Sequence, residues 1–306
     1  MRIKVIINAS AGTDDQAQEH RRLTEIFEAS DHEVSISLAH SGDELAGLVH
    51  RSTSENFHTI VAGGGDGTIN TVASALIGKN ISLGILPLGT FNYFARNLNI
   101  PLDLEQAALN IIAGHTVPVN VGEVNGRLFI NNSSLGLYPT IIREREKAYD
   151  RWGRSKFAAL LSGAITMLRP NPFLKVHLNA DRKEIACRTP LIFVNNNACQ
   201  MESYNIGGGE CLAEGKLGLY VTRPSNWPGL LWLAVRALCG RLRETSDLRV
   251  MCTQEAWIET RHRHIRVAID GEVVRLSTPL HYRMLHGALR VIVPAGTSGS
   301  ATKKNE

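Results

Sequence analysis

The first third of the chain alternates between two patterns of hydrophobic and polar residues. Short apolar runs rich in β-branched residues are followed by longer stretches in which apolar residues recur every three or four positions. The first pattern is typical of buried strands and the second of amphipathic helices, so residues 1–114 are predicted to form a three-layer α/β domain. The predicted strands are Arg2–Ala9, Glu33–Leu38, Thr59–Ala62 and Leu83–Leu86, and the predicted helices are Asp15–Ala29, Gly42–Arg51, Thr68–Ile77, Asn92–Leu98 and Leu104–Ala113.

The pattern changes at the Gly114–His115 junction to short, alternating or β-branched runs. A mostly antiparallel β-sandwich is therefore expected over residues 115–294, with a helical insert at Ile141–Leu168. The tail, residues 295–306, is polar and expected to be disordered. The predicted strands are Thr116–Val124, Arg127–Asn131, Leu174–Leu178, Leu191–Asn195, Leu217–Thr222, Arg249–Met251, Ala256–Glu259, Ile265–Ile269, Glu272–Leu276 and Ala288–Val293.

A glycine-rich turn follows the third predicted strand. Gly63, Gly64 and Gly65 are followed by Asp66, Gly67 and Thr68, where a helix is expected to begin. Glycines let the backbone N–H groups approach a phosphate, and the helix N-terminus adds unpaired donors. A carboxylate in such an anion cradle suits phosphoryl transfer, although glycine-rich turns also occur for packing alone. The turn lacks the Gly-Lys-Ser/Thr ending of a P-loop and the spacing of the Rossmann fingerprint.

Two further polar turns follow predicted strands of the same sheet. One runs from Pro87 through Gly89 and Thr90 to Asn92, and the other is Asn8–Gly12. Because parallel strands deliver their carboxyl ends to one edge of a sheet, the three turns are expected to line one ligand crevice.

These turns carry a family resemblance. Gly64–Asn70, with Pro87–Asn92 and a late Ile269–Glu272, resembles the diacylglycerol kinase catalytic-domain family, which includes bacterial lipid kinases and sphingosine kinases. The resemblance runs from about residue 2 to about residue 294. The glycine turn alone is shared with NAD kinases and phosphofructokinases. The second turn and the Asp-Gly-Glu motif restrict the resemblance to the lipid-kinase branch.

The resemblance implies transfer of the γ-phosphoryl group of ATP to a lipid hydroxyl with Mg²⁺. It implies that the nucleotide is held by residues of the three turns. These nucleotide-binding candidates are Asn8, Ser10, Gly12, Gly64, Gly65, Asp66, Gly67, Thr68, Asn70, Gly89, Thr90 and Asn92.

Glu272, Asp66 and Asp270 are the candidate catalytic carboxylates. An alcohol needs a base to accept its proton, which contributes roughly 10²–10⁴-fold. The bacterial branch implies the glutamate of Asp-Gly-Glu for this role, and the sphingosine-kinase branch implies the aspartate of the glycine turn. Glu272 is favoured here, with Asp66 organising magnesium or the acceptor. Asp270-Gly271 also fits a hairpin turn between strands.

The sequence departs from the family pattern at three positions. Tyr93 and Asn120 stand where aspartates are usual, and Glu214 stands where an aspartate would hold a second, structural magnesium. The resemblance implies that backbone carbonyls of Cys211 and Lys216 complete that metal site. The longer Glu214 side chain and the missing carboxylates weaken this expectation.

Composition agrees with a cytoplasmic enzyme. The five cysteines form no C-x-x-C pair, which favours reduced thiols, and Met1 leads directly into a strand, which leaves no room for a signal peptide. The formal charge of +4 suits nucleotides or an anionic membrane surface, whereas no nucleic-acid-binding signature is present. We therefore expect a cytoplasmic protein with peripheral contact at the inner membrane surface.

No apolar stretch reaches the length of a membrane span. The nearest, Trp227–Cys239, is predicted to be a helix that packs on the core or inserts shallowly into a bilayer surface. Two alternatives to a lipid kinase stay open: a soluble-metabolite kinase of the NAD kinase type, and a nucleotide-binding protein with little catalysis.

Three further polar groups are candidates of lower rank. His262 and His264 suit a metal pair or a solvated basic face, and Asn195–Asn197 suits substrate contact or a sharp turn. Ser133 and Ser134 lack the strand-elbow-helix context of a nucleophilic serine.

Overall fold

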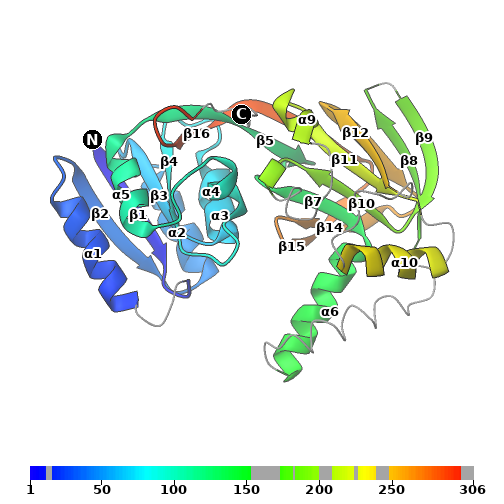
Figure 1. The fold of residues 1–306 in the computed structure, drawn as a ribbon, viewed down its shortest axis with the longest axis horizontal. Helices are drawn as coiled ribbons and strands as arrows, with labels where there is room; N and C mark the ends of the chain where they lie inside the picture. Colours follow the sequence, from blue (N-terminus) through cyan, green and yellow to red (C-terminus); the bar gives the residue numbers. More distant parts are fainter. Residues whose placement is uncertain are drawn as a thin grey trace. The chain divides into compact units, whose positions relative to one another are not determined.

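The computed structural model describes residues 1–11, 16–152, 173–181, 183–199, 209–223, 227–238 and 248–297. The chain forms two compact units (Figure 1): Met1–Val121 with Leu285–Glu306, and Gly122–Met284. It passes between them within β5 (Thr116–Val124) and within β16 (Leu280–Ile292). Val291 of β16 pairs in parallel with Leu83 and so joins the last strand to the first sheet.

The first unit contains a parallel sheet in the order β2-β1-β3-β4-β16. Each of the first four strands is followed by a helix, as the alternating pattern predicts. The elements are β1 (Arg2–Asn8), α1 (Gln16–Glu28), β2 (Glu33–Ala39), α2 (Gly42–Ser52), β3 (Thr59–Gly64), α3 (Asp66–Leu76), β4 (Ser82–Pro87), α4 (Tyr93–Asn97) and α5 (Leu104–Ala113).

Both faces of this sheet are buried. Ile3, Val5 and Ile7 of β1 pack with residues of α1 and α5, which also contact each other. α2 and α3 contact each other, and they pack against β1 and β3 respectively. The near-continuous apolar sequence of β3 and β4 follows from this two-sided burial. The predicted three-layer α/β arrangement is confirmed.

The second unit is built mainly from antiparallel strands. One sheet has the order β12-β11-β10-β7-β14-β15, and β13, β8 and β9 extend from β16 in the other. The strands are β6 (Arg127–Phe129), β7 (Asn132–Gly136), β8 (Leu174–Ala180), β9 (Lys183–Thr189), β10 (Leu191–Asn195), β11 (Leu217–Thr222), β12 (Leu248–Thr253), β13 (Glu255–Thr260), β14 (His264–Ile269) and β15 (Glu272–Ser277). The described helices are α6 (Leu137–Trp152), α9 (Gly209–Ala213) and α10 (Trp227–Leu238).

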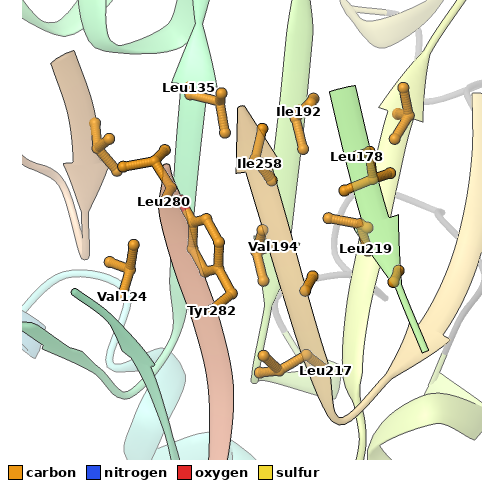
Figure 2. Close-up of a cluster of buried hydrophobic side chains, with 14 of the residues drawn as sticks. Val124, Leu135, Leu178, Ile192, Val194, Leu217, Leu219, Ile258, Leu280 and Tyr282 are labelled. Atoms are coloured by element: carbon orange, nitrogen blue, oxygen red, sulfur yellow. The ribbon is translucent and has the colours of Figure 1, made fainter. Parts of the chain in front are cut away.

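The core of the second unit lies between the two sheets. Leu178, Ile258 and Tyr282 come from one sheet, and Ile192 and Leu219 come from the other. Figure 2 shows these side chains between the two sets of strands, where alternate residues of each strand turn inward. The predicted antiparallel sandwich is therefore confirmed, and α6 covers the part of the predicted insert that the structure describes.

The expectation of reduced thiols is wrong for two cysteines. Cys211 of α9 and Cys252 of β12 form a disulfide, with their Cα atoms 4.9 Å apart. α9 packs against β11 and β12, which brings together residues 41 positions apart in the sequence. Spacing along the chain does not reveal such a pairing.

Candidate functional site

The three predicted turns follow the carboxyl ends of β1, β3 and β4. The chain runs from β1 outward to β2 and then returns to β3 on the other side of β1. Such a reversal opens a crevice at the carboxyl ends of the two central strands, which is where ligands bind in open α/β sheets. Asn8 and Gly64 are the last residues of these two strands.

The glycine turn and the second turn are in van der Waals contact. A Cβ atom on Gly89 would lie 2.5 Å from the Cα atom of Gly65 and 2.8 Å from Asn92 Oδ1. A Cβ on Gly64 would lie 2.5 Å from Thr68 Oγ1. Glycine at 89 is therefore required for the two turns to approach each other, and glycine at 64 leaves room for the Thr68 side chain.

Asn8 links the first turn to α3. Its Nδ2 donates to Thr68 Oγ1 at 3.1 Å, and its Oδ1 accepts from the Ser10 backbone N–H at 3.0 Å. The structure thus brings Asn8, Ser10 and Thr68 together, as the sequence predicts. Gly12 lies outside the described residues.

Asn92 and Asp66 hold the second turn. Asn92 has a positive φ of 50° at the N-cap of α4, and its buried amide bonds the backbone of Pro87 and Gly89. Both carboxylate oxygens of Asp66 accept backbone N–H groups, from Tyr93 at 3.2 Å and from Phe94 at 3.0 Å. Asp66 therefore caps α4 from the neighbouring turn.

The N-terminus of α3 has the features of an anion site. No side chain caps it, and the Cβ direction of Gly67 is open space within 4 Å. One turn into the helix, Asn70 Oδ1 is buried without a hydrogen-bond partner among the described residues. Uncapped N–H groups and the helix dipole favour a phosphate here, and the Asn70 amide oxygen is of the kind that Mg²⁺ prefers. Thr90 is exposed at the second turn.

The Asp-Gly-Glu motif lies in the second unit at a tight hairpin. Asp270 and Gly271 have φ angles of 45° and 91° between β14 and β15, so the predicted hairpin turn is confirmed. The Asp270 carboxylate accepts three backbone N–H groups, from Ile130, Asn131 and Asn132, at 2.8–2.9 Å. Glu272 begins β15 with an exposed side chain, and no described residue bonds its carboxylate.

The predicted metal segment is held by other interactions. Lys216 Nζ lies 2.8 Å from Glu214 Oε2, and the backbone carbonyl of Cys211 accepts the N–H of Lys216 at 2.8 Å. Among the described residues, no group of three or more His, Cys, Asp or Glu side chains gathers as a metal site. An ammonium group thus stands beside the carboxylate that would hold a cation, and the residues as they lie do not fit a divalent metal.

The three polar groups of lower rank form hydrogen bonds within the fold. Ser133 is fully buried with its hydroxyl 3.0 Å from the Tyr282 hydroxyl, and burial raises the pKa of Tyr282 above its usual range. Asn195 and Asn197 bond within a buried amide cluster that includes Asn131. His262 lies before β14, where its carbonyl accepts the hydroxyls of Thr260 and Thr278.

Tyr93 and Asn120 also have identifiable contacts. The Tyr93 ring stacks on Phe91 with a centroid distance of 5.4 Å, and Asn120 Oδ1 accepts the Gly287 N–H at 2.9 Å. The sequence predicts neither the Asp66 cap of α4 nor the Phe91–Tyr93 ring pair. The one strand-helix unit between Asp66 and Tyr93 is nevertheless compatible with the cap.

The fold is that of a two-unit α/β protein in which three polar turns follow the carboxyl ends of neighbouring strands of one sheet. Residues 2–124 match the family described as diacylglycerol kinase catalytic domain. The resemblance predicted from the three turns is thereby confirmed.

Individual relatives agree with this assignment. The chain is 27% identical over 310 residues to a protein named diacylglycerol kinase of Bacillus subtilis (strain 168), covering 96% of each chain. It is 37% identical over 140 residues, 45% of this chain and 46% of the relative, to a protein of Klebsiella pneumoniae (strain 342) named "Probable lipid kinase YegS-like". A crystal structure of a diacylglycerol kinase from Bacillus anthracis str. Sterne has the same fold, with a TM-score of 0.73 at 23% identity over 96% of this chain and 97% of that chain.

Proposed function

We propose that the protein is a lipid kinase that transfers the γ-phosphoryl group of ATP to a lipid hydroxyl with Mg²⁺. The observation that carries this proposal is the uncapped N-terminus of α3 behind two glycine turns that touch at Gly65 and Gly89. The family match and the names of the relatives support the same activity.

The nucleotide phosphates bind at the α3 N-terminus. Backbone N–H groups around Gly67 and Thr68 donate to phosphate oxygens, and the helix dipole adds to the attraction. Asn8, Ser10 and Thr90 lie on the neighbouring turns, and Gly12, outside the described residues, stays a candidate. Asp66 and Asn70 would hold magnesium, which when bound offsets phosphate charge.

Glu272 is the proton acceptor in this proposal. Of the three candidate carboxylates, Asp66 caps α4 and Asp270 caps the backbone of residues 130–132. These hydrogen bonds fix the orientation of both carboxylates toward the backbone. Glu272 carries no such bonds from described residues, so it is available to take the hydroxyl proton. Asp66 and Asp270 act as positioning residues.

The α10 helix provides contact with the bilayer surface. Its Leu230 and Leu233 are buried, whereas Leu231, Trp232 and Val235 are 59%, 57% and 41% exposed. The helix carries no acidic residue, and the Arg236 guanidinium lies 5.6 Å from the Trp232 ring centroid. An exposed apolar stripe with tryptophan and arginine suits shallow insertion among anionic head groups. None of the described helices is long and apolar enough to cross a membrane.

The experiment that tests the function is phosphate transfer from radiolabelled ATP. We expect Mg²⁺-dependent incorporation into diacylglycerol or another extracted lipid hydroxyl presented in vesicles, and none into NAD. Incorporation into NAD alone would replace the proposal with a soluble-metabolite kinase. ATP binding without transfer to any lipid would leave a nucleotide-binding protein. The expected site of action is the cytoplasmic face of the membrane, where ATP is available.

A further inference from the structure

A cavity in the second unit opens between edge strands of the two sheets. Its volume is about 300 Å³, and β9 and β12 are the last strands of their sheets. Its principal lining residues lie on β9, on β11 and directly after it, and on β12: Ile185, Cys187, Arg188, Val221, Arg223 and Arg249. No function assigned above uses these residues.

The cavity concentrates positive charge. Its described lining includes three arginines and no acidic residue. Within the part of the chain that the structure describes, no carboxylate pairs with Arg223 or Arg249. The Arg223 and Arg249 guanidinium groups repel each other, so binding an anion between them lowers the energy of the arrangement.

The register of the sheets explains how an arginine comes to face the cavity. Arg249 lies opposite Val221, and Met251 lies opposite the core residue Leu219. Because side chains alternate along a strand, Arg249 is on the same face of β12 as Met251, toward the other sheet. Arg249 accordingly lines the cavity together with Ile185 and Val221.

β9 contributes a second concentration of cations. Arg188 lies directly opposite Lys175 of β8, a like-charge pair that destabilises a sheet. The Arg188 guanidinium also lies 4.7 Å from the Phe173 ring centroid, which holds it over that ring. A neighbouring cavity of about 540 Å³ shares Cys187 and Arg188 and adds Lys175, His177 and Arg261, with Glu259 as the acidic residue of its described lining.

The pKa of the Cys187 thiol responds to two of these arginines. Burial raises the pKa of its thiol, while the positive charges of Arg249 and Arg223 act to lower it. Both arginines therefore lie close enough to the thiol to influence its ionisation, which agrees with their common place on the cavity.

We propose that this cavity is a binding site for a phosphate monoester. Arginine forks match phosphate oxygens in bidentate geometry, and the pair Arg223 and Arg249 suits a phosphate dianion better than a carboxylate. Ile185 and Val221 form an apolar wall for the carbon atoms of the ester. The volume is at the lower end of small-molecule sites, which accommodates a phosphate with a short organic group. The ester is either a soluble metabolite or a lipid head group.

Alkylation of Cys187 tests the site without measuring enzymatic activity. The rate at which iodoacetamide modifies Cys187 is followed by peptide mass spectrometry in the full-length protein. The probes are glycerol 3-phosphate, vesicles containing phosphatidate, and vesicles of phosphatidylcholine alone. We expect a saturable, at least fivefold slowing. Slowing by glycerol 3-phosphate identifies a soluble ester as sufficient, and slowing by phosphatidate vesicles alone identifies a lipid head group.

Two variants distinguish a probe that binds the arginines from one that covers Cys187 without contacting them. The measured quantity is the ratio of the alkylation rates with and without the probe. The double variant Arg223→Gln/Arg249→Gln should lose the slowing, whereas Arg127→Gln on β6 should retain it. The effective probe should also raise the thermal unfolding midpoint of the wild type and of Arg127→Gln, and not that of the double variant. If the double variant does not fold, Arg249→Gln alone serves.

Three results would overturn the proposal: no slowing by any probe, equal slowing by phosphatidylcholine vesicles, or slowing that persists in the arginine variants. None of them bears on phosphoryl transfer at the glycine turns, so the proposed function stands or falls separately.

Discussion

At the scale of single residues, Asp66 and Glu272 differ in their surroundings. The Asp66 carboxylate accepts the N–H groups of Tyr93 and Phe94, whereas Glu272 is exposed and bonds no described residue. The same kind of side chain therefore has a positioning role in one place and is available for proton transfer in the other.

We predict that Asp66→Asn lowers both stability and activity. An amide can accept through only one of its two polar atoms, so a part-buried N–H of α4 loses its partner at a cost of about 1–3 kcal/mol. Urea unfolding should show this loss, together with weaker nucleotide binding. An Asp66→Asn protein with wild-type unfolding free energy would contradict the capping role.

A second residue-level prediction concerns Gly89. In Gly89→Ala the new methyl group would lie 2.5 Å from the Gly65 Cα atom, so the two turns must separate. We expect a loss of about 1–3 kcal/mol in unfolding free energy and at least tenfold weaker ATP binding by calorimetry. Gly42→Ala, where the Cβ meets nothing within 4 Å, is the matched control. Equal ATP affinity in both variants would refute the close-contact argument.

The positions of the site residues could be predicted from the sequence only where neighbouring residues form a recognisable pattern. Glycine turns after apolar strands mark the crevice, so Asn8, Gly64 and Asn92 could be placed in advance. The clamp formed by Asp270 depends on backbone groups about 140 positions away. Arg223, directly after β11, and Arg249 of β12 are likewise brought to one cavity by strand pairing, and no spacing along the chain predicts that.

At the scale of elements, α9 is fastened to β12 where the family resemblance implies a metal. The Cys211–Cys252 disulfide and the Glu214–Lys216 ion pair hold this segment. The ion pair is on the surface and contributes little, so the disulfide is the main constraint.

We therefore predict that a reductant destabilises the protein. A disulfide closing a loop of this length stabilises by about 2–4 kcal/mol. Denaturant unfolding of the wild type should shift on reduction, Cys252→Ser should be insensitive, and Cys187→Ser should behave as the wild type. Titration of five free thiols in the untreated protein would contradict the pairing.

The exposed face of α10 leads to a prediction about membrane binding. Leu231→Ser/Trp232→Ser should reduce sedimentation with anionic vesicles at least tenfold, since each buried apolar side chain contributes about 1.5–3 kcal/mol. Leu109→Ser, at a 50% exposed leucine of α5, should have no effect. Equal vesicle binding by all three proteins would remove α10 from the proposed membrane contact.

Helices and strands can be predicted where apolar residues recur at a regular spacing. They are harder to predict where the burial of a residue depends on partners far away in the sequence. The strands and helices of the first unit follow their pattern closely. β7 was not predicted because Asn132, Ser133 and Ser134 are polar, yet all three are buried in the sheet. β9 and the first half of β16 were also missed, although Leu280, Tyr282 and Met284 alternate with polar residues.

At the scale of the whole molecule, two kinds of architecture supply different parts of the proposed reaction. The first unit carries the nucleotide turns on a doubly wound sheet, and the second unit carries Glu272 and α10 on a sandwich. Ligand-binding groups on turns supported by rigid sheets are a common arrangement. The central claim is that this protein phosphorylates a lipid hydroxyl with Glu272 as the base.

The most direct test is the rate of phosphoryl transfer by Glu272→Gln under saturating ATP and lipid. Because the amide cannot accept the hydroxyl proton, we expect kcat to fall about 10²–10⁴-fold, with ATP affinity and unfolding free energy unchanged. Glu184→Gln, at an exposed glutamate of β9, should match the wild type. A Glu272→Gln enzyme that keeps kcat within threefold of the wild type would contradict the account.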